Sequence, residues 1–152
     1  MLINIDPILN PDILHTLQSM GHGDTLILSD VNFPAYSNNS RVHRLDGVDI
    51  ARAAKAILSI FPLDGFIASP VQRMEIDGDP EKVNEVHQDM IDAVRTISGE
   101  EWKVTSIERN AFYEETRKAY AVIATTENRP YGCFILTKGV ILPDGSVWKP
   151  AT

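Results

Sequence analysis

The hydrophobic positions of the chain recur in two periods, one typical of amphipathic helices and one typical of strands. Three segments carry apolar residues at three- and four-residue spacing, which places those residues on one face of a helix. These segments are residues 11–20, 49–61 and 79–98. Asn10 and Asp79 stand at the N-cap positions of the first and third segments, and a proline follows each of them. Gly21 and Pro62 are expected to end the first and second helices.

The third helix has the longest apolar stripe, and we expect that stripe to be buried. It consists of Val83, Val86, Met90, Val94 and Ile97. A further short helix is expected over residues 111–119, with Asn110 as its cap.

Short runs rich in β-branched and aromatic residues predict strands between these helices. The expected strands are residues 25–29, 66–76, 102–107, 120–126 and 133–142. Pro70 breaks the second of them or confines it to an edge, because proline cannot donate to a strand ladder. Residues 31–46 are rich in Asn, Ser and Pro, which predicts a long loop. Long loops inside compact domains are usually functional or mobile.

Helices that alternate with strands predict an α/β fold, with helices on both faces of a sheet. The turn-forming stretch Glu127–Gly132 separates the last two strands, so they are expected to pair as a hairpin and make the sheet mixed. We therefore expect one three-layer α/β/α domain over residues 1–152. Residues 143–152 read as a polar C-terminal tail with Trp148 as its only anchor.

The composition and net charge of the chain exclude several classes of function. Hydrophobic residues make up 43% of the chain and charged residues 23%, which is the balance of a folded protein. The net charge of −7 argues against a nucleic-acid partner, because such a partner requires a dense basic face. The apolar runs are too short to span a membrane, and the first residues lack the pattern of a secretory signal. We expect a cytoplasmic protein whose single cysteine, Cys133, packs as a small apolar side chain.

Two sets of polar residues are candidates for chemistry. His22 lies between two glycines and can take or give a proton near neutral pH, although it also fits the negative end of the preceding helix. Asp30 directly follows one strand and Arg109 follows another, which is where ligands gather in open α/β sheets. An acid and a guanidinium suit a polyhydroxylated ligand, but Asp30 also fits an Asx turn and Arg109 an exposed surface position. His15, His43 and His87 are expected to be structural.

Five separated motifs resemble those of the ribose pyranase and fucose mutarotase family, in the same order and spacing. They are GHGD at 21–24, SDVNFP at 29–34, RNAFYE at 109–114, KAYAVIAT at 118–125 and YGCFILTKGV at 131–140. The resemblance implies an enzyme that interconverts cyclic forms of a free sugar without cofactor or metal. It also implies self-association into a ring-shaped homo-oligomer, typically a decamer.

The resemblance also implies roles for individual residues. His22 matches the family's proton donor. The chemistry of proton transfer, rather than the resemblance, makes Asp24 a second candidate catalytic residue, with either Asp24 or Asp30 expected to orient His22 or share the proton. Asp30, Arg109, Tyr131 and Cys133 match sugar-binding positions. Cys133 departs from the asparagine that the family usually has there, and a thiol is the weaker hydrogen-bonding group, so this contact and the preferred sugar are open.

Details of the motifs favour the fucose branch of the family. That branch is similar to this chain at Gly23 and at Asn32–Pro34, and Arg109 stands where the ribose branch tends to have histidine. The expected function is the interconversion of the α and β anomers of L-fucose or a related sugar. The alternatives are a ribose pyranase, which interconverts pyranose and furanose forms, and a non-catalytic sugar-binding or transport-accessory protein.

The spacing of His22 and Asp30 poses a geometric problem. An extended strand over residues 25–29, at about 3.3 Å per residue, places these two side chains at opposite ends. Either the Gly-His-Gly turn folds back toward Asp30, or the site is built from two subunits.

Overall fold

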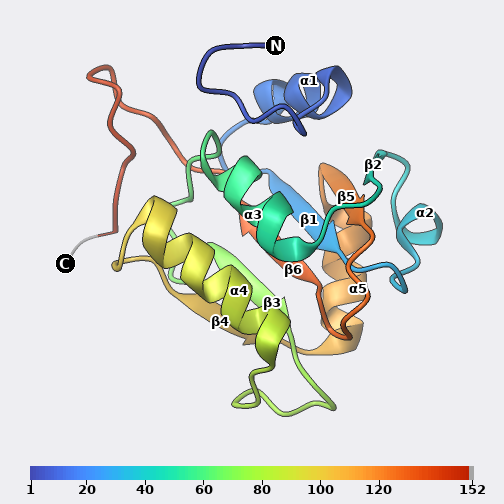
Figure 1. Cartoon of the computed structure of the whole chain (residues 1–152). Helices are drawn as coiled ribbons and strands as arrows, with labels where there is room; N and C mark the ends of the chain where they lie inside the picture. The colour runs from blue at the N-terminus through green and yellow to red at the C-terminus, as the bar shows by residue number, and fades with distance from the viewer. Residues whose placement is uncertain (151–152) are drawn as a thin grey trace.

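A computed structural model of the chain describes residues 1–150 and shows a six-stranded sheet with helices on both faces (Figure 1). The strand order is β2-β5-β1-β6-β3-β4. The strands are β1 Thr25–Ser29, β2 Val42–Leu45, β3 Val71–Met74, β4 Val104–Ile107, β5 Ala121–Thr125 and β6 Phe134–Thr137. The helices are α1 Pro11–Ser19, α2 Ala35–Asn38, α3 Ile50–Leu58, α4 Glu85–Ala93 and α5 Arg109–Lys118, and a π-helical turn, Val94–Ser98, extends α4. The expected α/β architecture is therefore confirmed.

The sheet is mixed because β6 alone runs against its neighbours. β1 pairs with β5 in parallel and with β6 antiparallel, and β6 also pairs antiparallel with β3. The expectation of a hairpin between the last two strands is wrong, because β1 lies between β5 and β6. The segment between them crosses over the end of β1, where the amide of Val31 donates to the carbonyl of Glu127 over 2.8 Å.

Alternate residues of the central strands fill two cores. Leu26 and Leu28 of β1 face α1, α3 and α4, and they belong to the larger cluster. Ile27, between them, faces α2 and α5 and belongs to the smaller cluster around Phe112. This period-two division gives the three layers that Figure 1 shows.

Local capping explains where most helices begin. The side chain of Asn10 accepts a hydrogen bond from the amide of Ile13, as expected. Asp49 caps α3 in the same way. Helix α5 begins two residues earlier than the sequence indicates, at Arg109, because Glu108 rather than Asn110 is its cap. Arg109 is therefore the first residue of a helix.

Two further sequence expectations need correction. Residues 31–46 are not one long loop, because they contain the short helix α2 and the edge strand β2. Helix α4 begins at Glu85, with Asn84 as its cap, and not at Asp79. Of the expected buried stripe, Val83 and Ile97 are exposed. Val83 lies before the helix begins, and Ile97 lies in the π-helical turn, where the 3.6-residue period no longer holds.

The C-terminal segment folds back as a small hairpin. Ile141 and Val147 form an isolated bridge, and the amide of Leu142 donates to the carbonyl of Ser146. Trp148 stacks on Phe66, so it does anchor this segment. Residues 151 and 152, which the single-domain expectation includes, lie outside the described part of the chain.

Candidate functional site

Three of the four predicted sugar-binding residues lie around the loops at one edge of the sheet. Because β1, β3 and β4 are parallel and β6 runs against β1 and β3, the ends of the first three strands meet the start of β6. Asp30 follows β1, Arg109 follows β4 and Tyr131 precedes β6. Cys133, the fourth, lies directly before β6 and packs below this edge. We call Asp30, Arg109, Tyr131 and Cys133 the strand-end cluster.

Asp30 joins two of these loops and is only 6% exposed. Its Oδ1 accepts hydrogen bonds from the amides of Asn32 and Phe33, which is the Asx turn that the sequence allows. Its Oδ2 accepts from the amide of Gly132 over 3.0 Å and from the thiol of Cys133 over 3.6 Å. Burial raises the pKa of Asp30, and these hydrogen bonds oppose that rise. The Asp30 carboxylate therefore joins the loop that follows β1 to the loop that precedes β6.

Cys133 is buried and is the only cysteine of the chain. Burial raises the pKa of its thiol well above the ordinary value, so the sulfur stays protonated and can donate to Asp30. The thiol thus faces the Asp30 carboxylate.

Tyr131 has a left-handed backbone conformation, with φ of +62°. Its hydroxyl donates to Oδ1 of Asp77 over 2.7 Å, and this hydrogen bond raises the pKa of Tyr131. The Tyr131 carbonyl accepts from Nε2 of the buried His87 over 3.0 Å. Burial lowers the pKa of His87 to about 4, so its ring is neutral and donates from Nε2. Asp77 and His87 together fix the orientation of Tyr131.

A depression of about 350 Å³ opens beside these residues. It is lined by Glu75, Asp77, Gly78, Glu108, Arg109 and Tyr131. Carboxylates, a guanidinium and a phenol are the groups that bind several sugar hydroxyls at once. This depression is the part of the strand-end cluster with room for a small polar ligand.

The loop that carries Tyr131 is fixed by an ion-pair network on its other side. Arg129 binds both Glu127, over 2.8 Å, and Asp89 of α4, over 2.7 Å. Glu127 is buried, and its hydrogen bonds with Arg129 lower the pKa of Glu127 to about 2. The pair of Glu127 and Arg129 therefore stays charged across the physiological pH range.

His22 lies at the opposite edge of the sheet. The amide of Gly23 donates to the carbonyl of Lys138, which follows the far end of β6, whereas Asp30 binds Gly132, which precedes the start of β6. His22 and Asp30 of one chain therefore do not meet, and the turn does not fold back. The strand-end cluster and His22 are separated by the length of the sheet.

The turn that carries His22 is held by two charged side chains. Oδ2 of Asp24 accepts from the amide of Gly21 over 2.7 Å, which closes the turn. Nζ of Lys138 donates to the carbonyls of Leu17 and Met20, each over 2.6 Å, and so caps the end of α1. Burial lowers the pKa of Lys138, and the nearby Asp24 opposes that change. Asp24 thus supports the turn, and the described residues show no hydrogen bond between it and the His22 ring.

Asp64 is the carboxylate that contacts His22. Its Oδ1 lies 3.1 Å from Nε2 of His22, and the same oxygen accepts from the amide of Phe66. Asp64 is buried, whereas the His22 side chain is 47% exposed. An ionised carboxylate only accepts, so Nε2 carries a proton and Nδ1 is the nitrogen left for a ligand.

Asp64 and Asp77 are functional candidates that sequence reasoning missed, whereas the buried His87 has the structural role expected of it. Each of the three forms a hydrogen bond with a residue far away in the sequence. Asp64 lies 42 positions from His22, and Asp77 and His87 lie 54 and 44 positions from Tyr131. No local motif signals these pairings.

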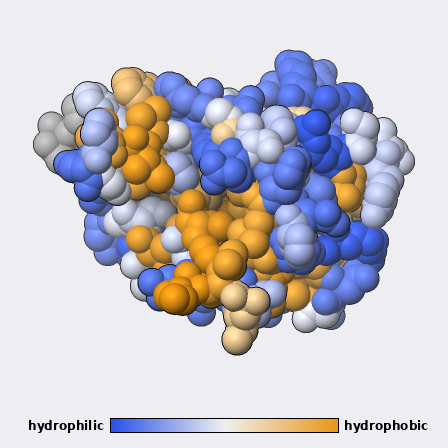
Figure 2. All heavy atoms as spheres, turned by 90° about the horizontal axis from the view of Figure 1, so that it is seen from above, coloured by the Kyte–Doolittle hydropathy of each residue, from blue (hydrophilic) through white to orange (hydrophobic). Residues whose placement is uncertain are grey.

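Hydrophobic residues gather in one area of the face that carries the N-terminal segment (Figure 2). A depression of about 610 Å³ includes His22 among mostly apolar lining residues, such as Leu2, Leu14, Met20 and Ile141. Apolar side chains that line an open depression are typical of interaction sites.

No helix within residues 1–150 is both long and apolar enough to cross a membrane. In the same residues, no three His, Cys, Asp or Glu side chains are grouped so that they could hold a metal ion.

Comparisons with known proteins show the family and the fold of the chain. Residues 3–141 match the RbsD / FucU transport protein family. The L-fucose mutarotase of Actinobacillus pleuropneumoniae is 39% identical over 141 residues, which cover 92% of this chain and 97% of the relative. The crystal structure of the fucose mutarotase from Streptococcus pneumoniae in complex with L-fucose is similar with a TM-score of 0.85. That structure is 35% identical, and the match covers 93% of this chain and all of the other. The solved protein Atu2016, described only provisionally as a sugar-binding protein, is 48% identical with a TM-score of 0.90, over 93% of this chain and 97% of that one.

Proposed function

Because the chain belongs to the RbsD / FucU transport protein family, we propose that it is a sugar mutarotase that interconverts the α and β anomers of L-fucose or a related free monosaccharide. The observation that carries this proposal is the similarity to L-fucose mutarotase over 92% of the chain. The exposed His22, with its buried carboxylate partner, supplies the residue type that the reaction needs.

The reaction requires two proton transfers and no strong nucleophile. In ring opening, the bond between C1 and the ring oxygen O5 breaks, O5 gains a proton and the anomeric hydroxyl loses one. The free aldehyde then rotates, and O5 attacks the other face of C1 while both transfers reverse. Positioned proton transfer contributes typically about 10²- to 10⁴-fold, which suits a reaction that already proceeds in water.

We assign the proton at O5 to His22. With Nε2 held by Asp64, the Nδ1 atom exchanges the proton with the sugar, and the Asp64 carboxylate stabilises the ring when it is protonated. Asp24 contributes by holding the turn on which the His22 ring stands. Arg109 and Tyr131, which line the depression, bind sugar hydroxyls. Asp30, with Cys133 against it, holds the start of β6 through the Gly132 amide and so helps to position the loop that carries Tyr131.

A complete site requires two subunits in this proposal. His22 and the strand-end cluster lie at opposite edges of one sheet, so His22 of one chain would meet the strand-end cluster of another. The exposed apolar surface around His22 supports self-association. A ring-shaped homo-oligomer, such as the decamer typical of the family, and a cytoplasmic location are parts of the proposal.

Saturation-transfer NMR on equilibrated sugars tests the proposed activity. The protein should speed exchange between the two anomer signals of L-fucose, whereas a sugar-binding protein would only broaden them. A panel of fucose, ribose, galactose and arabinose distinguishes a fucose mutarotase from a ribose pyranase by the sugar whose exchange is fastest. If no sugar exchanges faster than in buffer, the proposal of an enzyme is wrong.

A further inference from the structure

Phe66 is a large apolar side chain that lies exposed beside the proposed proton donor. Its ring centroid is 5.1 Å from that of His22, at a tilt of 49°. Phe66 lies on the loop before β3 and is 57% exposed. Its amide donates to the same Asp64 oxygen that binds His22, so one carboxylate fixes both residues.

Trp148, from the C-terminal hairpin, also contacts the Phe66 ring. The two rings stack with centroids 5.1 Å apart and an angle of 5° between their planes. Its indole is 43% exposed, so the two rings form a continuous apolar edge beside His22. We call Phe66 and Trp148 the aromatic wall.

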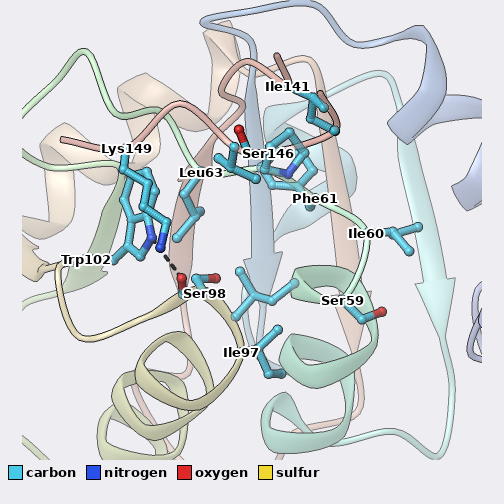
Figure 3. A pocket seen from close by; sticks show the side chains of 14 residues that line it. Ser59, Ile60, Phe61, Leu63, Ile97, Ser98, Trp102, Ile141, Ser146 and Lys149 are labelled. Atoms are coloured by element: carbon cyan, nitrogen blue, oxygen red, sulfur yellow. Dashed lines mark hydrogen bonds between the residues drawn. The ribbon is translucent and has the colours of Figure 1, made fainter. Parts of the chain in front are cut away.

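The hairpin is docked firmly enough to hold Trp148 in place. The Trp148 amide donates to the Val140 carbonyl over 2.9 Å, and Lys149 pairs with Glu101 over 2.5 Å. A side chain at Gly65 would lie 2.5 Å from the Trp148 carbonyl oxygen, so only glycine lets the hairpin approach. Together with Trp102, the side chains of Ser146 and Lys149 border a cavity of about 510 Å³ under the hairpin (Figure 3). The family match ends at residue 141, so Trp148 lies beyond the part that matches.

The chemistry at His22 indicates which part of a sugar the aromatic wall meets. The ring oxygen O5, which His22 protonates, is bonded to C5, and the methyl group of a 6-deoxy sugar is attached to C5. That methyl group is two bonds from the atom at which His22 acts. An apolar ring 5 Å from the imidazole is therefore well placed to cover the methyl and the adjoining C–H edge.

We propose that Phe66, supported by Trp148, recognises the methyl group of a 6-deoxy sugar at the His22 end of the site. This inference rests on the proposed mutarotase function. It assigns a role in specificity to the C-terminal hairpin, and it makes the chain favour 6-deoxy sugars over the corresponding pentose.

The test compares L-fucose with D-arabinose, which has the same ring configuration and a hydrogen in place of the methyl. The anomer-exchange rate of each sugar is measured by NMR for the unmodified protein and for Phe66→Leu, Phe66→Ala and Trp148→Ala. Tyr36→Ala is the matched control, because it removes another exposed aromatic ring from α2, on the other face of the sheet. The measured quantity is the ratio of kcat/KM for L-fucose to kcat/KM for D-arabinose.

We expect Phe66→Ala to lower this ratio by roughly fourfold, the value of one buried carbon group, mainly through the KM of L-fucose. Phe66→Leu and Trp148→Ala should lower it less, and Tyr36→Ala should leave it unchanged. The ratio is independent of the fraction of active protein, so a variant that only disturbs assembly lowers both rates and leaves the ratio constant. That outcome overturns the inference and assigns the aromatic wall to a subunit contact.

Failure of the proposed function looks different. If the unmodified protein speeds the exchange of neither sugar, the mutarotase proposal is wrong and this inference falls with it. If the unmodified protein acts on L-fucose but not on D-arabinose, the ratio cannot be formed. The KM for L-fucose is then compared between the unmodified protein and the variants. An unchanged KM in Phe66→Ala and Phe66→Leu then overturns the inference.

Discussion

At the scale of single residues, the pairing of His22 with Asp64 changes how the site is understood. The sequence singles out His22, because a histidine between two glycines is conspicuous. It does not reveal Asp64, because a carboxylate 42 residues away becomes a partner only when the loop before β3 packs against the turn after α1. Asp24 is nearer in sequence, but its side chain is engaged with the Gly21 amide. Sequence proximity therefore points to the wrong acid for this contact.

Replacement of Asp64 by asparagine tests its role. An amide cannot stabilise a protonated imidazole as a carboxylate does, so we expect Asp64→Asn to lower kcat by about tenfold or more with a small change in KM. Anomer exchange measured by NMR gives both constants. Asp46→Asn, at an exposed site that pairs with Arg44, is the control, and thermal unfolding checks that both variants fold. An unchanged kcat in Asp64→Asn would show that the hydrogen bond to His22 has no part in the chemistry.

The environment of Asp30 shows a second limit of residue-level reasoning. An Asx turn at Asp30 follows from its residue type and position, and the structure confirms it. Its hydrogen bond to Gly132 depends on β6 lying next to β1, which no local pattern encodes. The burial of Cys133 follows from the usual behaviour of a free cysteine, whereas its contact with Asp30 does not.

At the scale of elements, α4 shows why a well-formed start signal is overruled. Asp79 and Pro80 satisfy the local rules for a helix start. The buried guanidinium of Arg73, however, donates to the carbonyls of Pro80 and Lys82 and holds this segment outside the helix. The helix therefore begins after Asn84, whose side chain accepts from the amide of His87. Tertiary contacts decide between two caps that look equivalent in sequence.

The two caps can be compared directly by mutation. Asn84→Ala removes the helix cap and a hydrogen bond to the Pro130 carbonyl, so we expect the free energy of unfolding to fall by about 1 kcal/mol or more. Asp79→Ala removes only an exposed turn contact to the amide of Glu81 and should cost less. Urea unfolding monitored by circular dichroism gives both values. A larger loss for Asp79→Ala would mean that the segment before α4 contributes more to stability than the helix cap.

At the scale of the whole molecule, the sequence predicts the layers but not the order of the strands. Alternating helix and strand patterns are local and identify the three-layer class. The position of β6 between β1 and β3 depends on pairing between residues more than a hundred positions apart in the case of β1. A hairpin of β5 and β6 is what the short connection between them predicts. In the structure β1 lies between these two strands and pairs with both.

A mixing experiment tests the shared site at this scale. His22→Ala and Asp30→Ala are each expected to be inactive, and the two are unfolded together and reassembled at equal amounts. If His22 of one chain serves the strand-end cluster of its neighbour in a head-to-tail ring, about one quarter of the contacts regain both groups. Recovery of activity toward that fraction is expected. Because Asp30 also orders two loops, the experiment is repeated with Arg109→Ala in its place.

The control for this experiment is each variant reassembled alone, which should stay inactive. Native mass spectrometry verifies that the assemblies contain both variants. A verified mixed assembly without any recovered exchange would mean that the site does not combine His22 and the strand-end cluster from two chains.

The opposite placement of His22 and the strand-end cluster has an arithmetic consequence for the proposed assembly. Each chain offers half of a site at either edge of its sheet, so a row of n chains that is open at both ends contains n − 1 complete sites. Closing the row into a ring joins the two unmatched halves and gives every chain a share in two working centres. Ring closure then adds one active site as well as one subunit contact. The activity per chain is therefore higher in a closed ring than in an open row of the same length.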